Sequence, residues 1–239
     1  METRIYKKCV KIQSVYRGFI FRIKNLPLIM LKIQFFLKSS KNLIFSKQSD
    51  DGRINSCLDE DTIIKILIDN FKDRIKKSNS RMWHDFIIYD NYYGWIPVNI
   101  KTTTTKTADN TGNLAMCVYA YTDKILKLDK IYENGKMSVV LLEKFKNKNY
   151  NTRHKKDYYF LVVNKNNTSE IIINSLKGLE KITPNVNNLP FQVIWNKNKY
   201  FVYKNIQYRI EEFIKCLKNP KPSWKETFMF EIRQLQDMN

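Results

Sequence analysis

Three residues near the middle of the chain, Asp85, Asn99 and Lys101, have side-chain types and a spacing that suit chemistry at a metal ion. Asp85 and Asn99 offer oxygen atoms, which are the ligands that hard divalent cations prefer. Lys101 lies two residues beyond Asn99, so both side chains would lie on one face of a strand. If Asp85 came close to that face, the two oxygen donors could share a metal and the lysine could reach the same spot.

A β-hairpin over residues 84–106 would bring these side chains together. Residues 84–89 and 95–102 alternate and are rich in β-branched or aromatic types, which predicts two strands joined by a five-residue loop at 90–94. Pro97 favours an edge position or a bulge. Symmetric closure places Asp85 opposite Asn99, where Cβ atoms are about 5 Å apart. The same register places Phe86 opposite Val98 and Ile88 opposite Ile96, so a slip of one residue would bury the charged side chains.

Asp85, followed across a hairpin by Asn99-Ile100-Lys101, resembles the signature of the PD-(D/E)XK restriction-endonuclease-like superfamily. The threonines after the lysine resemble type II restriction enzymes in particular. The resemblance implies that Asp85 binds Mg²⁺ or Mn²⁺ and that Lys101 orients or polarises the attacking water. Asn99 falls where the family usually has its second carboxylate, and a neutral amide removes charge that a hard cation favours. The alternative interpretation is a half-buried hairpin with a solvated lysine.

Two further carboxylates are candidates for the same site. Apolar residues recur at helical spacing over 57–77, and Glu60 lies four residues before Ile64 on the core-facing side. Type II restriction enzymes often place a glutamate on a helix before the hairpin, so the resemblance suggests Glu60 as a metal ligand and catalytic residue. A glutamate that serves only the helix start, beside a cap at Ser56 or Asp59, is the alternative. Asp109 could replace the carboxylate that Asn99 lacks.

Polar and basic residues after the predicted strands could contact DNA. Threonine, asparagine and lysine side chains hydrogen-bond to phosphates and base edges. The candidates lie in the loop at 102–113 and in a basic turn near 197, and they are Thr103, Thr104, Lys106, Asn110, Lys197 and Lys199. The loop at 176–188 could either contact DNA or be an ordinary surface loop.

The composition favours a polyanionic partner. Lys and Arg number 42 against 23 Asp and Glu, a net charge of +19, which fits nucleic acid. A lysine-rich bias from an AT-rich genome would explain part of this charge. The four scattered cysteines and two histidines show no zinc spacing, and they favour a reducing intracellular compartment. No P-loop, dinucleotide-binding fingerprint or secretory signal is recognisable, and the apolar run at 19–37 carries too many cations to span a membrane.

The N-terminal region has a second motif. Residues 12–22 read IQSVYRGFIFR, and they resemble the IQ motif that calmodulin-type proteins bind as a helix. The positions that carry the resemblance are Ile12, Gln13, Arg17, Gly18 and Arg22. Apolar residues on one side with cations around them are typical of an amphipathic target helix. A basic arm that packs on the domain or lies along DNA phosphates fits equally well.

The remaining pattern divides the chain into a basic helical IQ-like arm at 1–40, a linker at 41–56 and a nuclease-like domain at 57–239. We expect an α/β fold with a restriction-endonuclease-like mixed central sheet flanked by helices. Helices are predicted at 114–128, 206–217 and 224–235, and strands at 137–142, 158–164, 170–175, 191–195 and 200–203.

Together these features predict an intracellular, Mg²⁺- or Mn²⁺-dependent endonuclease of the type II restriction class, acting as a homodimer on double-stranded DNA with a metal-bound water. The IQ-like motif and the AT-rich composition hint at a large DNA virus of a eukaryotic host. Two alternatives stay open. The chain could bind DNA without cutting it because of Asn99, or it could be a calmodulin-binding interaction protein.

Overall fold

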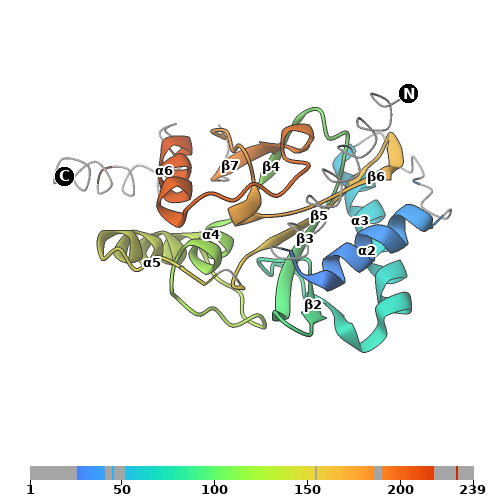
Figure 1. The fold of residues 1–239 in the computed structure, drawn as a ribbon, viewed down its shortest axis with the longest axis horizontal. Helices are drawn as coiled ribbons and strands as arrows, with labels where there is room; N and C mark the ends of the chain where they lie inside the picture. The colour runs from blue at the N-terminus through green and yellow to red at the C-terminus, as the bar shows by residue number, and fades with distance from the viewer. Residues whose placement is uncertain are drawn as a thin grey trace, which may run out of the picture.

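The computed structural model describes residues 26–40, 45, 52–153, 155–185, 190–217 and 230. Its centre is a five-stranded mixed sheet in the order β1-β2-β3-β5-β6 (Figure 1). The strands are β1 (Ile75–Lys77), β2 (Phe86–Asp90), β3 (Gly94–Thr103), β5 (Tyr159–Asn164) and β6 (Asn167–Ser175). Strands β3 and β5 are parallel, and the other neighbours in this sheet are antiparallel.

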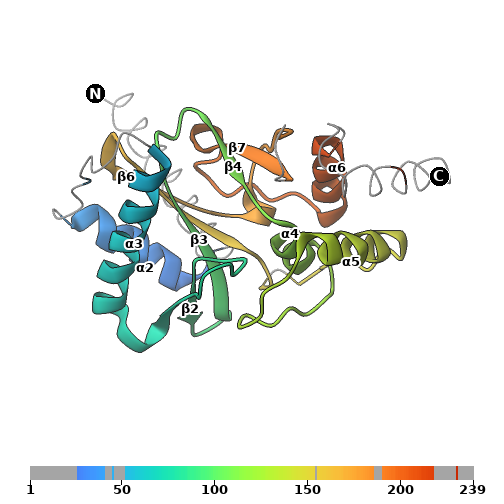
Figure 2. The same cartoon turned by 180° about the vertical axis from the view of Figure 1, so that it is seen from behind.

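Helices cover the sheet on both faces, as Figures 1 and 2 show from opposite sides. One group holds α2 (Leu28–Ser39) and α3 (Gly52–Phe71). The other holds α4 (Leu114–Tyr121), α5 (Asn134–Lys146), α6 (Ile206–Cys216) and a small antiparallel sheet of β4 (Ala108–Thr111) and β7 (Phe191–Ile194). Three short 3₁₀ helices complete the described elements: η1 (Lys72–Arg74), η2 (Leu176–Gly178) and η3 (Trp195–Lys197). The predicted α/β class and the mixed sheet with flanking helices are confirmed.

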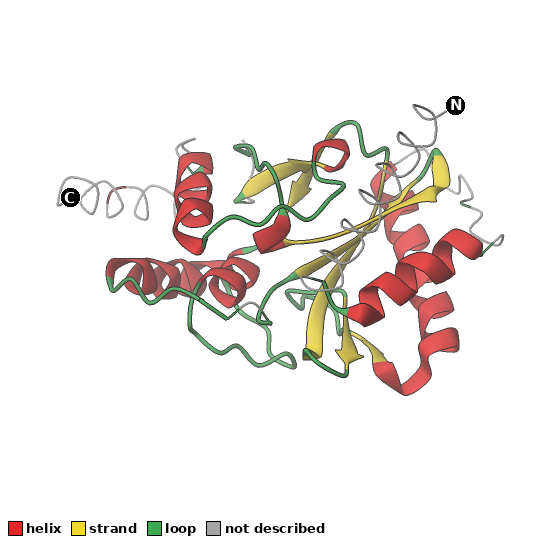
Figure 3. Cartoon of the chain, viewed as in Figure 1, coloured by secondary structure: helices red, strands yellow, loops and turns green. Residues whose placement is uncertain are grey.

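Strand β5 separates two hydrophobic cores. All six of its residues are buried, and successive side chains of a strand point to opposite faces. Tyr159, Leu161 and Val163 pack with α2 and α3, whereas Phe160 and Val162 pack with α4, α5 and β7. The alternating layers of strand and helix are visible in Figure 3. Because β5 is parallel to β3, the carboxyl ends of the two strands lie at the same edge of the sheet.

The hairpin has the predicted register, with Phe86 opposite Val98 and Ile88 opposite Ile96. The ladder extends to the Asp90–Gly94 pair, so three residues form the turn rather than five. Gly94 has φ of +73°, a conformation that a residue without Cβ adopts at little cost. Pro97 lies in the middle strand of the sheet and not at the predicted edge position. Pairing with β5 begins only at Val98, so Pro97, which has no N–H group, need not donate a hydrogen bond to β5.

Asp90 joins this hairpin to the first described helix. Its Oδ1 accepts hydrogen bonds from the N–H groups of Tyr92 (2.8 Å) and Tyr93 (3.1 Å) in the turn. Its Oδ2 accepts from the N–H of Ile29 at the start of α2 (3.0 Å). One buried carboxylate therefore satisfies donors from two elements that lie far apart in the sequence.

Several predicted boundaries are wrong. The segment 137–142 is not a strand but part of helix α5, in which Met137, Leu141 and Phe145 are buried at spacings of four residues. Residues 200–203 form no strand, and the helix predicted at 114–128 ends at Tyr121. Two segments of the predicted loop at 102–113 are instead strand, the end of β3 and the whole of β4.

The N-terminal division also differs from the prediction. Helix α3 begins at Gly52, inside the predicted linker at 41–56, and it ends at Phe71, so neither Ser56 nor Asp59 caps it. Ile75, predicted as helical, lies in β1. Helix α2 lies in the predicted arm, yet its buried side chains belong to the core beneath β2 and β3. The IQ-like residues 12–22 and, apart from Phe230, the predicted helix at 224–235 lie outside the described residues. In the described part of the chain, no helix has the length and apolar character needed to cross a membrane.

Candidate functional site

The candidate site lies where β2 begins, beside the second half of β3. The Val98 carbonyl accepts from the N–H of Asp85 (3.0 Å), so the even-numbered residues of β3 turn their backbone groups toward β2. The described hydrogen-bond ladder between β2 and β3 stops at the Phe86–Val98 pair. Beyond this pair, two carboxylates accept hydrogen bonds from the N–H groups of β3. Asp85 Oδ2 accepts the N–H of Ile100 (2.8 Å), and Glu60 Oε1 accepts the N–H of Thr102 (3.1 Å).

Helix α3 supplies Glu60 and fastens it to this strand edge. Ser56 lies one helical turn before Glu60. Its hydroxyl donates to the Thr102 carbonyl (3.4 Å), and the Thr102 hydroxyl donates to the Ser56 carbonyl (3.3 Å). Two residues on the same helix face are therefore bound to one residue of β3. Glu60 thus lies at the same edge of β3 as Asp85, on a helix whose boundaries differ from those predicted.

Asn99 contacts Asp85 directly, as the predicted register requires. Its Nδ2 donates to Asp85 Oδ2 (2.6 Å), so this carboxylate oxygen accepts two hydrogen bonds. Asn99 Oδ1 is buried and has no hydrogen-bond partner among the described residues. Leaving a buried acceptor without a partner costs about 1–3 kcal/mol. A cation or a water molecule bound at this oxygen would remove that cost.

Lys101 faces an open hollow of about 490 Å³ beside these carboxylates. The hollow is formed by the first half of α3, the end of β3, the start of β4 and the residue after β5. Its lining residues are Ser56, Cys57, Glu60, Lys101, Thr102, Thr103, Thr104, Thr107, Ala108, Asp109, Asn110 and Lys165. It therefore lies at the carboxyl ends of the two parallel strands, an edge at which α/β sheets commonly bind ligands.

Burial and mutual charge set the protonation of this cluster. Burial raises the pKa of Glu60 to about 7, and the nearby Lys101 ammonium opposes only part of that shift. Burial also raises the pKa values of Asp85 and Asp109, again opposed by Lys101. Burial alone would lower the pKa of Lys101, but the carboxylates of Glu60, Asp109 and Asp85 together raise it. Lys101 is thus a permanent cation at neutral pH, suited to stabilising negative charge and not to accepting a proton.

Asp109 comes from the small second sheet. It lies in β4 opposite Val193 of β7, and its Oδ2 accepts a hydrogen bond from Trp195 Nε1 (2.8 Å). The carboxylate lines the hollow and interacts electrostatically with Lys101. Asp109 therefore brings a further carboxylate to the hollow that Lys101 lines.

The donor atoms fit a hard cation that keeps several waters. Asp85 Oδ1 and Glu60 Oε2 make no hydrogen bond to any residue in the described ranges, and Asn99 Oδ1 is unpartnered. The Ile100 carbonyl points to the same side of β3 as its N–H. Among the described residues there is no cluster of three or more His, Cys, Asp or Glu side chains that could hold a metal. A metal here would therefore depend on the amide oxygen, the backbone and water, as Mg²⁺ sites with one or two carboxylates do.

The predicted DNA-contacting residues fall into two groups. Thr103, Thr104 and Asn110 line the hollow. Lys106 and Lys197 are exposed, and Lys199 is exposed but forms an ion pair with Glu170. Lys106 also interacts electrostatically with Glu170, so the two lysines lie around one acid.

Sequence reasoning missed two elements of the hollow. Lys165 directly follows β5, its N–H donates to the Thr103 carbonyl (3.0 Å), and its Nζ donates to Ser56 Oγ (2.6 Å). The parallel pairing of β3 with β5 was the missing information, because carboxyl ends of parallel strands lie at one edge. Cys57 lines the same hollow, and no sequence signal pointed to it.

His84, next to Asp85, has a structural role. Its ring is 3% exposed, and Nδ1 is 2.6 Å from Ser78 Oγ while Nε2 is 2.9 Å from the Leu128 carbonyl. Burial lowers the pKa of His84, which favours the neutral ring. His84 is therefore a buried histidine whose two ring nitrogens both have partners within the protein.

Comparison of the chain with models of known protein families and with curated protein sequences gave no match.

Proposed function

We propose that this chain is a metal-dependent endonuclease of the PD-(D/E)XK, type II restriction class, which hydrolyses phosphodiesters in double-stranded DNA. The observation that carries the proposal is the meeting of Glu60, Asp85 and Asn99 at one strand edge, with Lys101 beside them. The context also supports it, because a helix precedes the hairpin, a helix follows it, and the sheet is mixed.

Each residue has a distinct task in this proposal. Glu60 and Asp85 each keep one oxygen on a β3 N–H, which fixes the carboxylate while the other oxygen can hold Mg²⁺ or Mn²⁺. Asn99 Oδ1 would complete the protein ligands. Such an ion supplies Lewis acidity at the phosphate and lowers the pKa of a water molecule. Lys101 stabilises the negative charge that develops on the attacked phosphate, in a site partly screened from solvent.

The direct test is plasmid cleavage in Mg²⁺ or Mn²⁺ by the unchanged chain, Asn99→Asp and Lys101→Ala. We expect discrete fragments from the unchanged chain and their loss in Lys101→Ala. Lys130→Ala is a matched control, because it removes an exposed lysine that does not line the hollow. Cleavage that persists unchanged in Lys101→Ala would refute the assignment.

A second candidate function is DNA binding without cleavage. The observation that favours it is the hydrogen bond from Asn99 to Asp85, which places a donor where the family usually has a second carboxylate. In this case Asn99→Asp gains cleavage while the unchanged chain only shifts DNA in a gel. If neither protein cleaves DNA but both still bind it, DNA binding is the function.

Cleavage of both strands would require two copies of the site, so we propose a homodimer on DNA. Sedimentation of the chain with and without a DNA duplex tests this stoichiometry. The proposal of calmodulin binding through Ile12–Arg22 rests on the sequence motif alone. Failure of both the intact chain and a synthetic peptide of residues 5–26 to bind calmodulin would remove that partner.

A further inference from the structure

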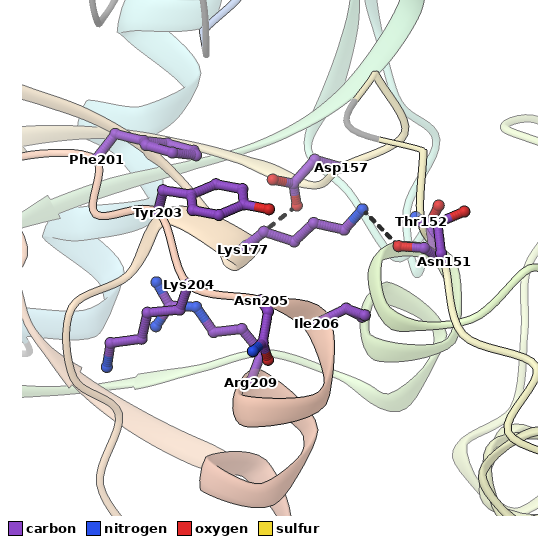
Figure 4. A pocket seen from close by; sticks show the side chains of 10 residues that line it. All are labelled: Asn151, Thr152, Asp157, Lys177, Phe201, Tyr203, Lys204, Asn205, Ile206 and Arg209. Carbon is purple, nitrogen blue, oxygen red and sulfur yellow. Dashed lines mark hydrogen bonds between the residues drawn. The ribbon is translucent and has the colours of Figure 1, made fainter.

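A second cavity lies at the other end of β5 from the hollow. Lys165 of the hollow follows this strand, whereas Asp157 of the cavity precedes it. A strand of six residues spans about 20 Å, so the two sites are separate. The cavity has a volume of about 220 Å³ and is drawn in Figure 4. Its lining residues are Asn151, Thr152, Asp157, Lys177, Phe201, Tyr203, Lys204, Asn205, Ile206 and Arg209.

The size and walls of this cavity suit one planar ring. A cavity of about 150 Å³ accommodates benzene, and drug-sized ligands occupy about 300–1,000 Å³. The rings of Phe201 and Tyr203 lie on one side of the space, and the Lys177 side chain crosses it on the other (Figure 4). Aromatic side chains are the usual surfaces on which unpaired bases stack.

The charged groups of the cavity are held in place by the protein, and three of the four are cations. Lys177 Nζ donates to the carbonyls of Asn151 (3.3 Å) and Arg153 (2.9 Å), so one of its three hydrogens is left for a ligand. Arg209 is 3% exposed, and within the described residues its Nε has no hydrogen-bond partner. Asp157 is also 3% exposed, and its Oδ1 accepts from the N–H groups of Tyr158 and Lys177.

We infer that this cavity binds a nucleobase that carries phosphate, with the base against Tyr203 and Phe201 and the anion near Lys177. Both a free nucleotide and an unpaired base in a nucleic-acid strand have this chemistry. Lys177, Lys204 and Arg209 line the cavity with one acid, Asp157. Glu212 forms ion pairs with Lys204 (2.8 Å) and Arg209 (3.2 Å), so the preference for an anionic ligand over a neutral heterocycle rests on Lys177. The site is independent of the proposed nuclease centre.

Tyr203 and Tyr200 provide a matched pair of variants for the test. Both are exposed, at 69% and 68%, but only Tyr203 lines the cavity, so neither Tyr203→Ala nor Tyr200→Ala removes core packing. In the first arm, calorimetry measures binding of the four 5′-nucleoside monophosphates, ribose 5-phosphate and orthophosphate. In the second arm, fluorescence follows a duplex with one extrahelical 2-aminopurine against a fully paired duplex.

Loss of one stacking partner weakens base binding by about tenfold. We expect Tyr203→Ala to bind nucleotides, the extrahelical base, or both about tenfold more weakly than the unchanged chain. Tyr200→Ala should bind them as tightly as the unchanged chain. The two arms thereby distinguish a free nucleotide from a base in a strand. Lys101→Ala should bind the same probe as tightly as the unchanged chain. Ribose 5-phosphate binding as tightly as the nucleotides, or equal behaviour of the two tyrosine variants in both arms, would overturn the inference.

Discussion

Glu60 makes the stability of the metal-free protein depend on pH. Its pKa is about 7 in the folded chain against 4.5 in the ordinary carboxyl, because burial disfavours the ionised form. The folded chain therefore binds this proton more tightly than the unfolded chain, and stability falls as the pH rises from about 4.5 through about 7. Each pKa unit corresponds to about 1.4 kcal/mol, so the whole loss from this residue is about 3.5 kcal/mol.

The test compares the unchanged chain with Glu60→Gln, which keeps an oxygen for the Thr102 N–H but carries no charge. Urea unfolding in EDTA at pH 5 and pH 8 gives the free energy of unfolding of each protein. We expect Glu60→Gln to gain about 2–3 kcal/mol relative to the unchanged chain between these two pH values. Titrating groups outside this cluster are common to both proteins and cancel in the difference.

Magnesium extends the same experiment. A metal that binds only the folded chain adds about 2.7 kcal/mol at a concentration of one hundred times its Kd. At pH 8 we expect Mg²⁺ to stabilise the unchanged chain more than Glu60→Gln. A stability difference that does not change with pH would refute the reasoning, because it would mean that Glu60 ionises as in water and does not lie buried against β3.

Three further predictions concern single side chains. Asn99→Asp places a second carboxylate against Asp85, so we expect a loss of about 1–3 kcal/mol in EDTA that Mg²⁺ reverses; a thermal melt unchanged by EDTA would contradict this. Asp90→Ala leaves three backbone N–H groups without their acceptor and should cost about 3 kcal/mol in urea unfolding; a loss under 1 kcal/mol would argue against the link to α2. If Lys165 contacts a phosphate, Lys165→Met should weaken DNA binding and reduce the salt slope by about one; an unchanged slope would exclude that contact.

The hairpin could be predicted from sequence because its information is local. Alternation fixes which side chains share a face, and the apolar face opposes any slip, so the Asp85–Asn99 contact followed. The α5 segment was mistaken for a strand because Val139 and Val140 suggest a strand, whereas the spacing of Met137 and Leu141 indicates a helix.

The rest of the site depends on contacts between distant segments. The pairing of β4 with β7 places Trp195 on Asp109, although the two residues are 86 positions apart. Lys165 reaches the hollow only because β5 lies parallel to β3. Such non-local pairings leave little trace in local hydrophobic periodicity, and the cavity around Tyr203 likewise draws its walls from four separate segments.

The short β2 strand has a consequence for solubility. Beyond Val98, β3 carries N–H groups at Ile100 and Thr102 that are occupied by carboxylates and not by a neighbouring strand. Unpaired strand edges are templates for pairing with other chains. We therefore expect the acidic side chains proposed for catalysis to protect this edge from pairing with another chain as well. A double variant that replaces Asp85 and Glu60 with alanine should form oligomers through this edge. Light scattering would detect these oligomers without an assay of cleavage.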